Sequence, residues 1–119
     1  MRELVKTFKA LSDDTRLRIL NVLMERECCV CEVMQALDIS QARASRNLSA
    51  LYDVGFLKLR RNGLWALYSI DEEGLRGYSV DLIEAVRKAL EGNEIALQDK
   101  QRLKSAERVG PSCVSKKTR

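Results

Sequence analysis

Residues 28–55 contain the pattern that most constrains the fold of this chain. Apolar residues at helical spacing occupy 31–37, a tripeptide follows at 38–40, and a second helical pattern runs over 41–54 before Gly55. Three residues is the turn length of a helix-turn-helix. Glycine just after the second pattern is a typical helix end. The segment therefore predicts a helix-turn-helix.

The outer face of the second helix has the composition of a DNA-reading surface. Ala44, Leu48 and Leu51 share its inner face at 100° per residue, while the rest carries arginine, serine and glutamine with no acid before Asp53. Such side chains bond base edges and phosphates, although a solvated surface helix would look similar. With Ser40 as the helix cap, we predict these DNA-binding residues: Ser40, Gln41, Arg43, Ser45, Arg46 and Asn47.

A β-hairpin is predicted directly after this helix. Apolar and polar residues alternate from Phe56 to Ile70 around Asn62-Gly63, the strongest two-residue hairpin signal. Arg60 and Arg61 lie beside the tip. A basic hairpin serving only solubility is the alternative, but its position favours a winged helix-turn-helix whose arginines reach the DNA backbone or minor groove.

Apolar helices flank this unit on both sides. Residues 2–11 form an amphipathic helix, and a second, largely apolar helix follows with Ser12 as its expected N-cap. From Glu72 the pattern returns to helix and ends at Gly92-Asn93. The outer stripes are wide for so small a core, so we predict a symmetric homodimer. Its interface residues would be Leu4, Val5, Phe8, Leu75, Leu82, Ile83, Val86 and Leu90.

The fold class predicted is mainly α with a small β-hairpin, a homodimeric winged helix-turn-helix. Residues 1–91 form the DNA-binding and dimerisation domain, and 92–119 form a C-terminal extension. Within the extension we expect one polar helix over 94–109, a break at Gly110-Pro111, and then a basic, disordered tail.

Composition narrows the classes of function. At 119 residues, with 5% aromatics and one proline, the chain suits a single helical domain. It has neither an apolar run of about 18 residues nor a signal-peptide pattern, so we expect a cytoplasmic protein with reduced thiols. Its net charge of +4 is compatible with a polyanionic partner. The absence of histidine removes histidine-based catalysis and mixed imidazole metal sites, so we predict no enzyme.

Three thiols at Cys28, Cys29 and Cys31 precede the helix-turn-helix. Cys29 and Cys31 lie about 200° apart in a regular helix, so all three sulfurs converge on one ion only if the helix start is unwound. Buried structural cysteines are one alternative, and a redox sensor is another. Neighbouring acids such as Glu32 would raise thiol pKa values and oppose redox activity. Cys113 is a candidate additional ligand.

Four sequence blocks together resemble the ArsR/SmtB family of metal- and arsenic-responsive repressors: residues 13–20, 29–32, 37–48 and 63–68. The resemblance covers about residues 1–91. It implies a winged-helix homodimer that represses a resistance operon and leaves its operator when an ion binds. The family's zinc-type site on the last helix needs histidine, which this chain lacks.

The thiol motif agrees with the family only in part. Cys29-Val30-Cys31-Glu32 looks like the Cys-Val-Cys-Asp motif of arsenic- and cadmium-type members. The arsenic-type pattern has a third cysteine three positions later, where this chain has Met34. A thioether is a poor substitute for a thiolate, and Cys28 is the candidate replacement.

The leading hypothesis is therefore a repressor that binds double-stranded operator DNA and responds to As(III) or Sb(III) through Cys28, Cys29 and Cys31. A second hypothesis keeps the fold and replaces the signal with Cd(II) or Pb(II), with Cys113 as a fourth sulfur. The third hypothesis, from another class of function, is a thiol-based redox-sensing regulator or a small thiol-transfer enzyme. The leading hypothesis involves neither a membrane nor a small organic substrate.

Overall fold

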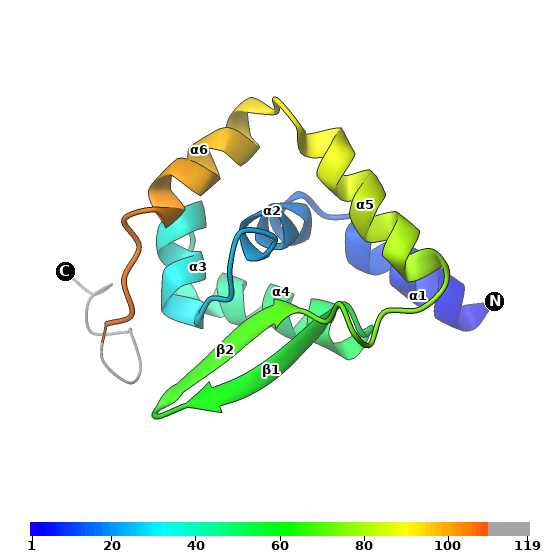
Figure 1. Cartoon of the computed structure of the whole chain (residues 1–119), viewed down its shortest axis with the longest axis horizontal. Helices are drawn as coiled ribbons and strands as arrows, with labels where there is room; N and C mark the ends of the chain where they lie inside the picture. The colour runs from blue at the N-terminus through cyan, green and yellow to red at the C-terminus, as the bar shows by residue number, and fades with distance from the viewer. Residues whose placement is uncertain (110–119) are drawn as a thin grey trace.

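The computed structural model describes residues 1–109 and confirms a mainly helical fold with one small hairpin (Figure 1). The predictions for the tail and for Cys113 lie outside the described residues. In chain order the elements are α1 (Arg2–Leu11), α2 (Asp14–Leu23), α3 (Val30–Leu37), α4 (Gln41–Asp53), β1 (Leu57–Asn62), β2 (Trp65–Ile70), α5 (Tyr78–Leu90) and α6 (Glu94–Leu103).

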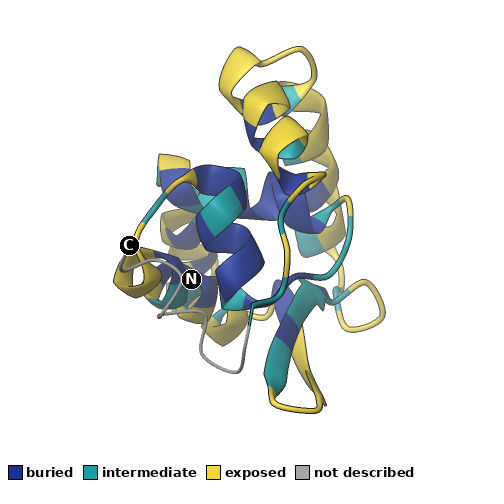
Figure 2. Ribbon diagram, turned by 90° about the vertical axis from the view of Figure 1, so that its left-hand side faces the viewer, coloured by how far each residue is buried: buried dark blue, intermediate teal, exposed yellow. Residues whose placement is uncertain are grey.

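Helix α2 is the buried spine, as its apolar circumference predicted. In Figure 1 it lies at the centre of the molecule with the other helices around it. Ile19, Leu20 and Val22 are fully buried. Figure 2 shows buried residues gathered where helices face one another and exposed residues at the hairpin tip. No helix among residues 1–109 is long and apolar enough to cross a membrane.

The N-cap of α2 is Asp13, so the prediction of Ser12 was wrong by one residue. The Asp13 carboxylate accepts the Arg16 backbone N–H at 3.0 Å. Ser12 still belongs to the end of α1, where its hydroxyl donates to the Phe8 carbonyl at 2.8 Å. The hydroxyl is therefore already satisfied, and the carboxylate beside it caps α2 with a favourable charge at the helix N-terminus.

The helix-turn-helix forms where the sequence predicted it. Residues 38–40 separate α3 from α4, and Asp38 takes a left-handed conformation with φ 58°. Ser40 caps α4 by accepting the Arg43 backbone N–H at 3.2 Å. Gly55 follows the helix with φ 90°, a conformation that glycine adopts without a Cβ clash. The expected inner face of α4 is fully buried.

The hairpin turn is displaced by one residue from the prediction. Asn62 pairs with Trp65, so the two-residue turn is Gly63-Leu64 rather than Asn62-Gly63. Gly63 has φ 66° and Leu64 is not among the positive-φ residues, the pattern of a type II′ turn. Leu64 is consequently exposed at the tip, while Leu67 becomes the fully buried residue of β2.

The predicted dimer residues are distributed over α1, α5 and the loop before α5. That loop occupies residues 71–77, so α5 begins at Tyr78 rather than near Glu72. Phe8 is 49% exposed, and Leu4 and Val5 are also exposed. Ile83 is the exception, because it packs in the protomer's own core and is 6% exposed. The other four are half-buried: Leu75, Leu82, Val86 and Leu90.

Helix α6 ends at Leu103, six residues earlier than predicted, and it packs against α2 and α3. Its Asp99 carboxylate is fully buried and accepts Arg18 Nε at 2.7 Å and Arg102 Nη2 at 2.8 Å. Asn21 of α2 donates to the Ala96 carbonyl. The segment expected to be an appended extension thus covers two helices of the DNA-binding unit.

Replacing Asp99 tests how strongly this packing depends on the buried charge. Asp99→Asn is expected to lower the free energy of unfolding by about 3 kcal/mol, because Arg18 and Arg102 lose their shared carboxylate. Urea unfolding measures the change. The control is Glu25→Gln, which removes the half-exposed pair with Lys100 and should change stability by less than about 1 kcal/mol. Equal effects of the two substitutions would contradict this assignment.

Candidate metal-binding and nucleic-acid-binding sites

All three thiols before the helix-turn-helix are buried, but they belong to two different clusters. Cys28 lies in the main hydrophobic core. Cys29 and Cys31 pack with Leu67 of the hairpin, and Trp65 and Val109 flank them. We call this second group the thiol cluster. It places two of the predicted ligands together against the wing and leaves the third in the core.

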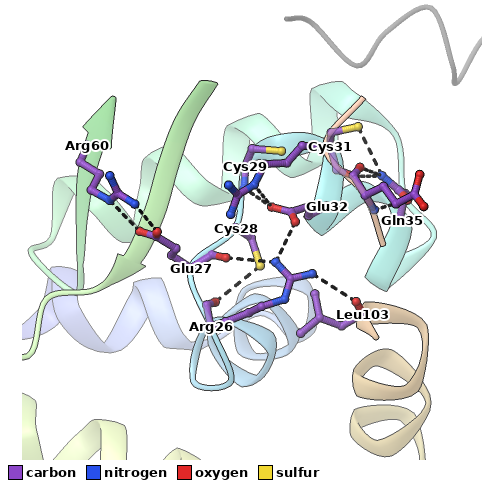
Figure 3. Close-up of polar contacts among 11 residues, drawn as sticks. Arg26, Glu27, Cys28, Cys29, Cys31, Glu32, Gln35, Arg60 and Leu103 are labelled. Atoms are coloured by element: carbon purple, nitrogen blue, oxygen red, sulfur yellow. Dashed lines mark hydrogen bonds and ion pairs between the residues drawn. The ribbon is translucent and has the colours of Figure 1, made fainter. Parts of the chain in front are cut away.

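The structure does not bring the three sulfurs together as a site. Among residues 1–109, no group of three or more cysteine or acidic side chains is placed to hold a metal ion. The reason is that α3 begins regularly at Val30 with Cys29 as its N-cap, rather than with an unwound turn. Figure 3 shows the Cys28 sulfur directed at the Arg26 carbonyl and the Cys31 sulfur directed at Gln35.

Cys28 is also held by its backbone. It forms an isolated antiparallel bridge with Tyr68. The Cys28 N–H donates to the Tyr68 carbonyl at 3.0 Å, and the Tyr68 N–H donates to the Cys28 carbonyl at 2.8 Å. The thiol segment is therefore hydrogen-bonded directly to β2 of the wing.

A buried carboxylate, Glu32, organises the start of α3. It is 3% exposed, and its Oε1 accepts the Cys29 backbone N–H at 2.9 Å. It also pairs with Arg26 at 2.7 Å and with Arg108 at 3.1 Å. Burial alone would raise the pKa of Glu32, but the Cys29 amide and the two guanidinium groups outweigh it and lower the pKa. Glu32 therefore remains charged and joins the thiol segment to the C-terminal residues.

Cys28 and Cys29 are not activated thiols. Burial, reinforced by the Glu32 charge, raises the pKa of Cys28 to about 12. Burial also raises the pKa of Cys29. Redox-active cysteines instead have lowered pKa values in electropositive, accessible surroundings. These surroundings do not favour the redox-sensor hypothesis, and they mean that an ion binding here must displace protons.

Residues 104–109, which we call the C-terminal strap, close over α3. The Gln35 side chain donates to the Glu107 carbonyl at 2.7 Å and accepts the Glu107 N–H at 3.1 Å. The same amide donates to Cys31 Sγ at 3.3 Å. Neither Gln35 nor the strap was predicted as part of the site, because a contact between residues 72 positions apart leaves no periodic signal in the sequence.

Some of the predicted DNA-binding residues of α4 are exposed, and others make contacts within the protein. Gln41 and Arg46 are exposed, and Ser45 is half-buried beside them. The hydroxyl of Ser40 accepts the Arg43 backbone N–H as the helix cap. The Arg43 guanidinium donates to the Thr15 hydroxyl at 2.7 Å. The residues best placed for an external partner are therefore Gln41, Ser45 and Arg46.

Asn47 does not lie on the exposed face of α4, contrary to the prediction. It is 9% exposed, its Nδ2 donates to the Arg43 carbonyl, and its Oδ1 accepts Arg16 Nη1. The helical period places position 47 beside the buried residues 44, 48 and 51. Its amide therefore serves contacts inside the protein.

The two wing arginines differ. Arg60 Nε donates to Glu27 Oε2 at 3.0 Å, and hydrogen bonding to Glu27 raises the pKa of this fully exposed guanidinium. Arg61, next to it, is also exposed. Because Glu27 immediately precedes the thiols, the Arg60 pair is a second link between the wing and the thiol segment.

This arrangement of helices and hairpin defines a winged helix-turn-helix. Residues 13–58 match the family model described as bacterial regulatory protein, arsR family. The chain is 44% identical over 75 residues to a cadmium resistance transcriptional regulatory protein, a CadC homolog of Staphylococcus aureus, with 62% of each chain covered. It is 32% identical over 95 residues to the arsenical resistance operon repressor of Bacillus subtilis, covering 78% of this chain and 90% of that repressor.

A solved structure shares the fold. The chain matches the homodimeric winged helix-turn-helix DNA-binding domain of a possible ArsR-family transcriptional regulator from Mycobacterium bovis. The TM-score is 0.64 at 28% identity, covering 78% of this chain and 82% of that chain. The chain belongs to the arsR family of bacterial regulatory proteins. The family resemblance seen in the sequence is confirmed. These relatives are named as transcriptional regulators or repressors, in agreement with the prediction that the chain is not an enzyme.

The relatives are named for resistance to different ions. The Staphylococcus relative is named for cadmium resistance and the Bacillus relative for arsenical resistance. The chain spans 62% of the length of the Staphylococcus relative and 60% of the arsenic resistance transcriptional regulator ArsR1 of Pseudomonas putida, to which it is 44% identical over 77 residues. An argument about the ion that this chain binds therefore has to start from its own cysteines.

Glu32→Gln tests the link between the thiol segment and the C-terminal strap. The substitution keeps the size of the side chain but removes the charge shared by Arg26 and Arg108. We expect a loss of about 2 kcal/mol in unfolding free energy and faster hydrogen exchange in residues 104–109. Glu25→Gln is the matched control. Unchanged exchange in the strap would contradict the proposed link.

Proposed function

We propose that this protein is a dimeric, DNA-binding repressor that leaves its operator when a thiophilic ion, As(III) or Sb(III), binds to cysteine thiolates. The observation that carries the proposal is the position of Cys29 and Cys31. They flank the first turn of the first helix of a helix-turn-helix and pack together against Leu67 of the wing. An ion bound there acts on both DNA-contacting elements.

The donor set fits a soft ion. Thiolates are the ligands that such ions select, and the chain has no histidine to offer. Cys29 and Cys31 already share the thiol cluster. Cys28 is the proposed third ligand, which requires it to leave the core. Cys113 is its rival, because it lies four residues after Val109, itself in contact with the cluster, and four residues span up to about 14 Å.

Cadmium or lead remains the alternative signal. The similarity to the cadmium resistance regulator of Staphylococcus aureus favours this possibility. A divalent ion with four sulfur ligands would use Cys113 together with Cys28, Cys29 and Cys31. The two hypotheses differ in the number of sulfurs they need: a three-sulfur arsenic site uses either Cys28 or Cys113, and a four-sulfur site needs both.

Ion binding is coupled to DNA binding through the start of α3. Drawing Cys29 and Cys31 toward one ion has to distort the turn that Glu32 caps. The distortion reaches α4 through the three-residue turn and reaches the wing through the Cys28–Tyr68 bridge. A coupling free energy of about 1–3 kcal/mol would weaken operator binding roughly 5- to 150-fold.

The dimer is proposed to form through α1 and α5. Leu4, Val5 and Phe8 on α1 are exposed, as are Tyr78 and Val80 on α5. Burying such apolar faces against a second copy is favourable and gives a two-fold axis. The similar domain from Mycobacterium bovis is homodimeric. Two recognition helices would then read half-sites separated by about 34 Å.

The ion is tested by titrating reduced protein bound to fluorescent upstream DNA and following anisotropy. We expect arsenite to release the DNA at one equivalent per chain. Cys29→Ser and Cys31→Ser should bind DNA and ignore arsenite, and Cys28→Ala should match them if Cys28 is the third ligand. Full response of Cys28→Ala with loss in Cys113→Ser would assign the third position to Cys113. Arsenite release from a triple Cys28/Cys29/Cys31→Ser protein would refute the proposal.

Arg46→Ala tests the recognition helix. Arg46 is exposed on α4, and its loss should weaken operator binding about tenfold. If the contact is to a phosphate, the slope of log affinity against log salt should fall by about one. Arg76→Ala is the control, since it removes the same charge from the loop before α5. Equal affinities of the Arg46 and Arg76 variants would exclude Arg46 from the interface.

A further inference from the structure

Arg16 joins three helices with one side chain. It lies in the first turn of α2, where its Nε donates to the Ala10 carbonyl at 2.6 Å and its Nη2 to the Lys9 carbonyl at 3.1 Å. Both carbonyls belong to the last turn of α1, whose carbonyl groups have no partner within the helix, and the Lys9 carbonyl also accepts the Ser12 backbone N–H at 3.1 Å. Its Nη1 donates to Asn47 Oδ1 on α4 at 3.0 Å.

The recognition helix is held by a second contact from the same part of α2. The Arg43 side chain donates to the Thr15 hydroxyl, and the Asn47 amide donates back to the Arg43 carbonyl. Thr15 and Arg16 are adjacent on α2, while Arg43 and Asn47 are one turn apart on α4. The N-terminus of α2 therefore contacts α4 at two positions one helical turn apart. Of the two α2 residues involved, Arg16 is the one that also bonds to α1.

We infer that Arg16 is a positioning residue, which acts through Asn47 to fix the orientation of the recognition helix α4 relative to α1. The inference depends on the proposed function, in which α1 contributes to the dimer. A two-fold axis applies any rotation of α4 to both protomers, so the separation of the two recognition helices depends on this contact. Arg16 therefore sets which half-site spacing the dimer accepts.

The guanidinium group suits this role. Its N–H donors are fixed in one plane, so it bonds α1 and α4 simultaneously in a defined geometry. A lysine keeps the charge but carries a single flexible ammonium group. Arg16→Lys is therefore the informative substitution, and Asn47→Ala removes the same link from the α4 side while leaving Arg16 bonded to α1.

The test is a set of palindromic duplexes whose half-site spacing changes by single base pairs around the helical repeat of about 10 bp, together with a duplex that contains one half-site. Wild-type protein should prefer one spacing. Arg16→Lys and Asn47→Ala should lower that preference about fivefold, the loss expected for one hydrogen bond. Their binding to the single half-site should stay within about twofold of wild type. The double variant should be no worse than either single variant.

Arg76→Lys is the control for the change of arginine to lysine, and thermal unfolding of each variant measures stability. If the variants keep the wild-type spacing preference, the role of Arg16 is refuted. A uniform loss at every spacing and at the half-site would also refute it, because Asn47 would then contact DNA or serve stability alone. If Arg16→Lys does not fold, Asn47→Ala decides between these outcomes. A wild-type protein without any spacing preference would refute the dimeric operator proposal and, with it, the role of Arg16.

Discussion

The charged carboxylate of Glu32 is the interaction on which the arrangement of the site depends. An unpaired charge at 3% exposure would be strongly destabilising. Here an amide and two guanidinium groups satisfy it, from the thiol segment, from the loop after α2 and from the C-terminal strap. Because charge-assisted hydrogen bonds are the strong ones, Glu32 holds the C-terminal strap, 76 residues further along the chain, against the loop after α2 and the start of α3, directly beside the thiols.

The proposed sensing site is therefore part of the structural core rather than an addition to it. The sulfurs fill hydrophobic clusters, and the backbone around them connects to the wing and to α3. An inducer can bind only by exchanging these contacts for bonds to the ion. Because the three thiols are buried in the free protein, an ion-bound conformation has to differ from the one described here.

The sequence predicted best what depends on neighbouring residues. The helix-turn-helix, the Ser40 cap and the glycine end of α4 follow from local chemistry and were correct. The one-residue errors at Ser12 and at the hairpin turn arose where two adjacent residues both suited the position. The docking of α6, the pairing of Glu32 with Arg108 and the inward direction of Asn47 depend on contacts across the chain. No spacing rule predicts such contacts, and they decide which candidate residues are available.

The bridge between Cys28 and Tyr68 has a consequence for solubility. A two-stranded hairpin normally presents two open edges, each able to pair with a strand of another molecule. The Cys28 backbone occupies the outer side of β2 at Tyr68. The opposite edge of the hairpin belongs to β1, whose Lys58, Arg60 and Arg61 are charged and exposed. The basic side chains considered for DNA contact thus also oppose edge-to-edge pairing of the hairpin with a strand of another molecule.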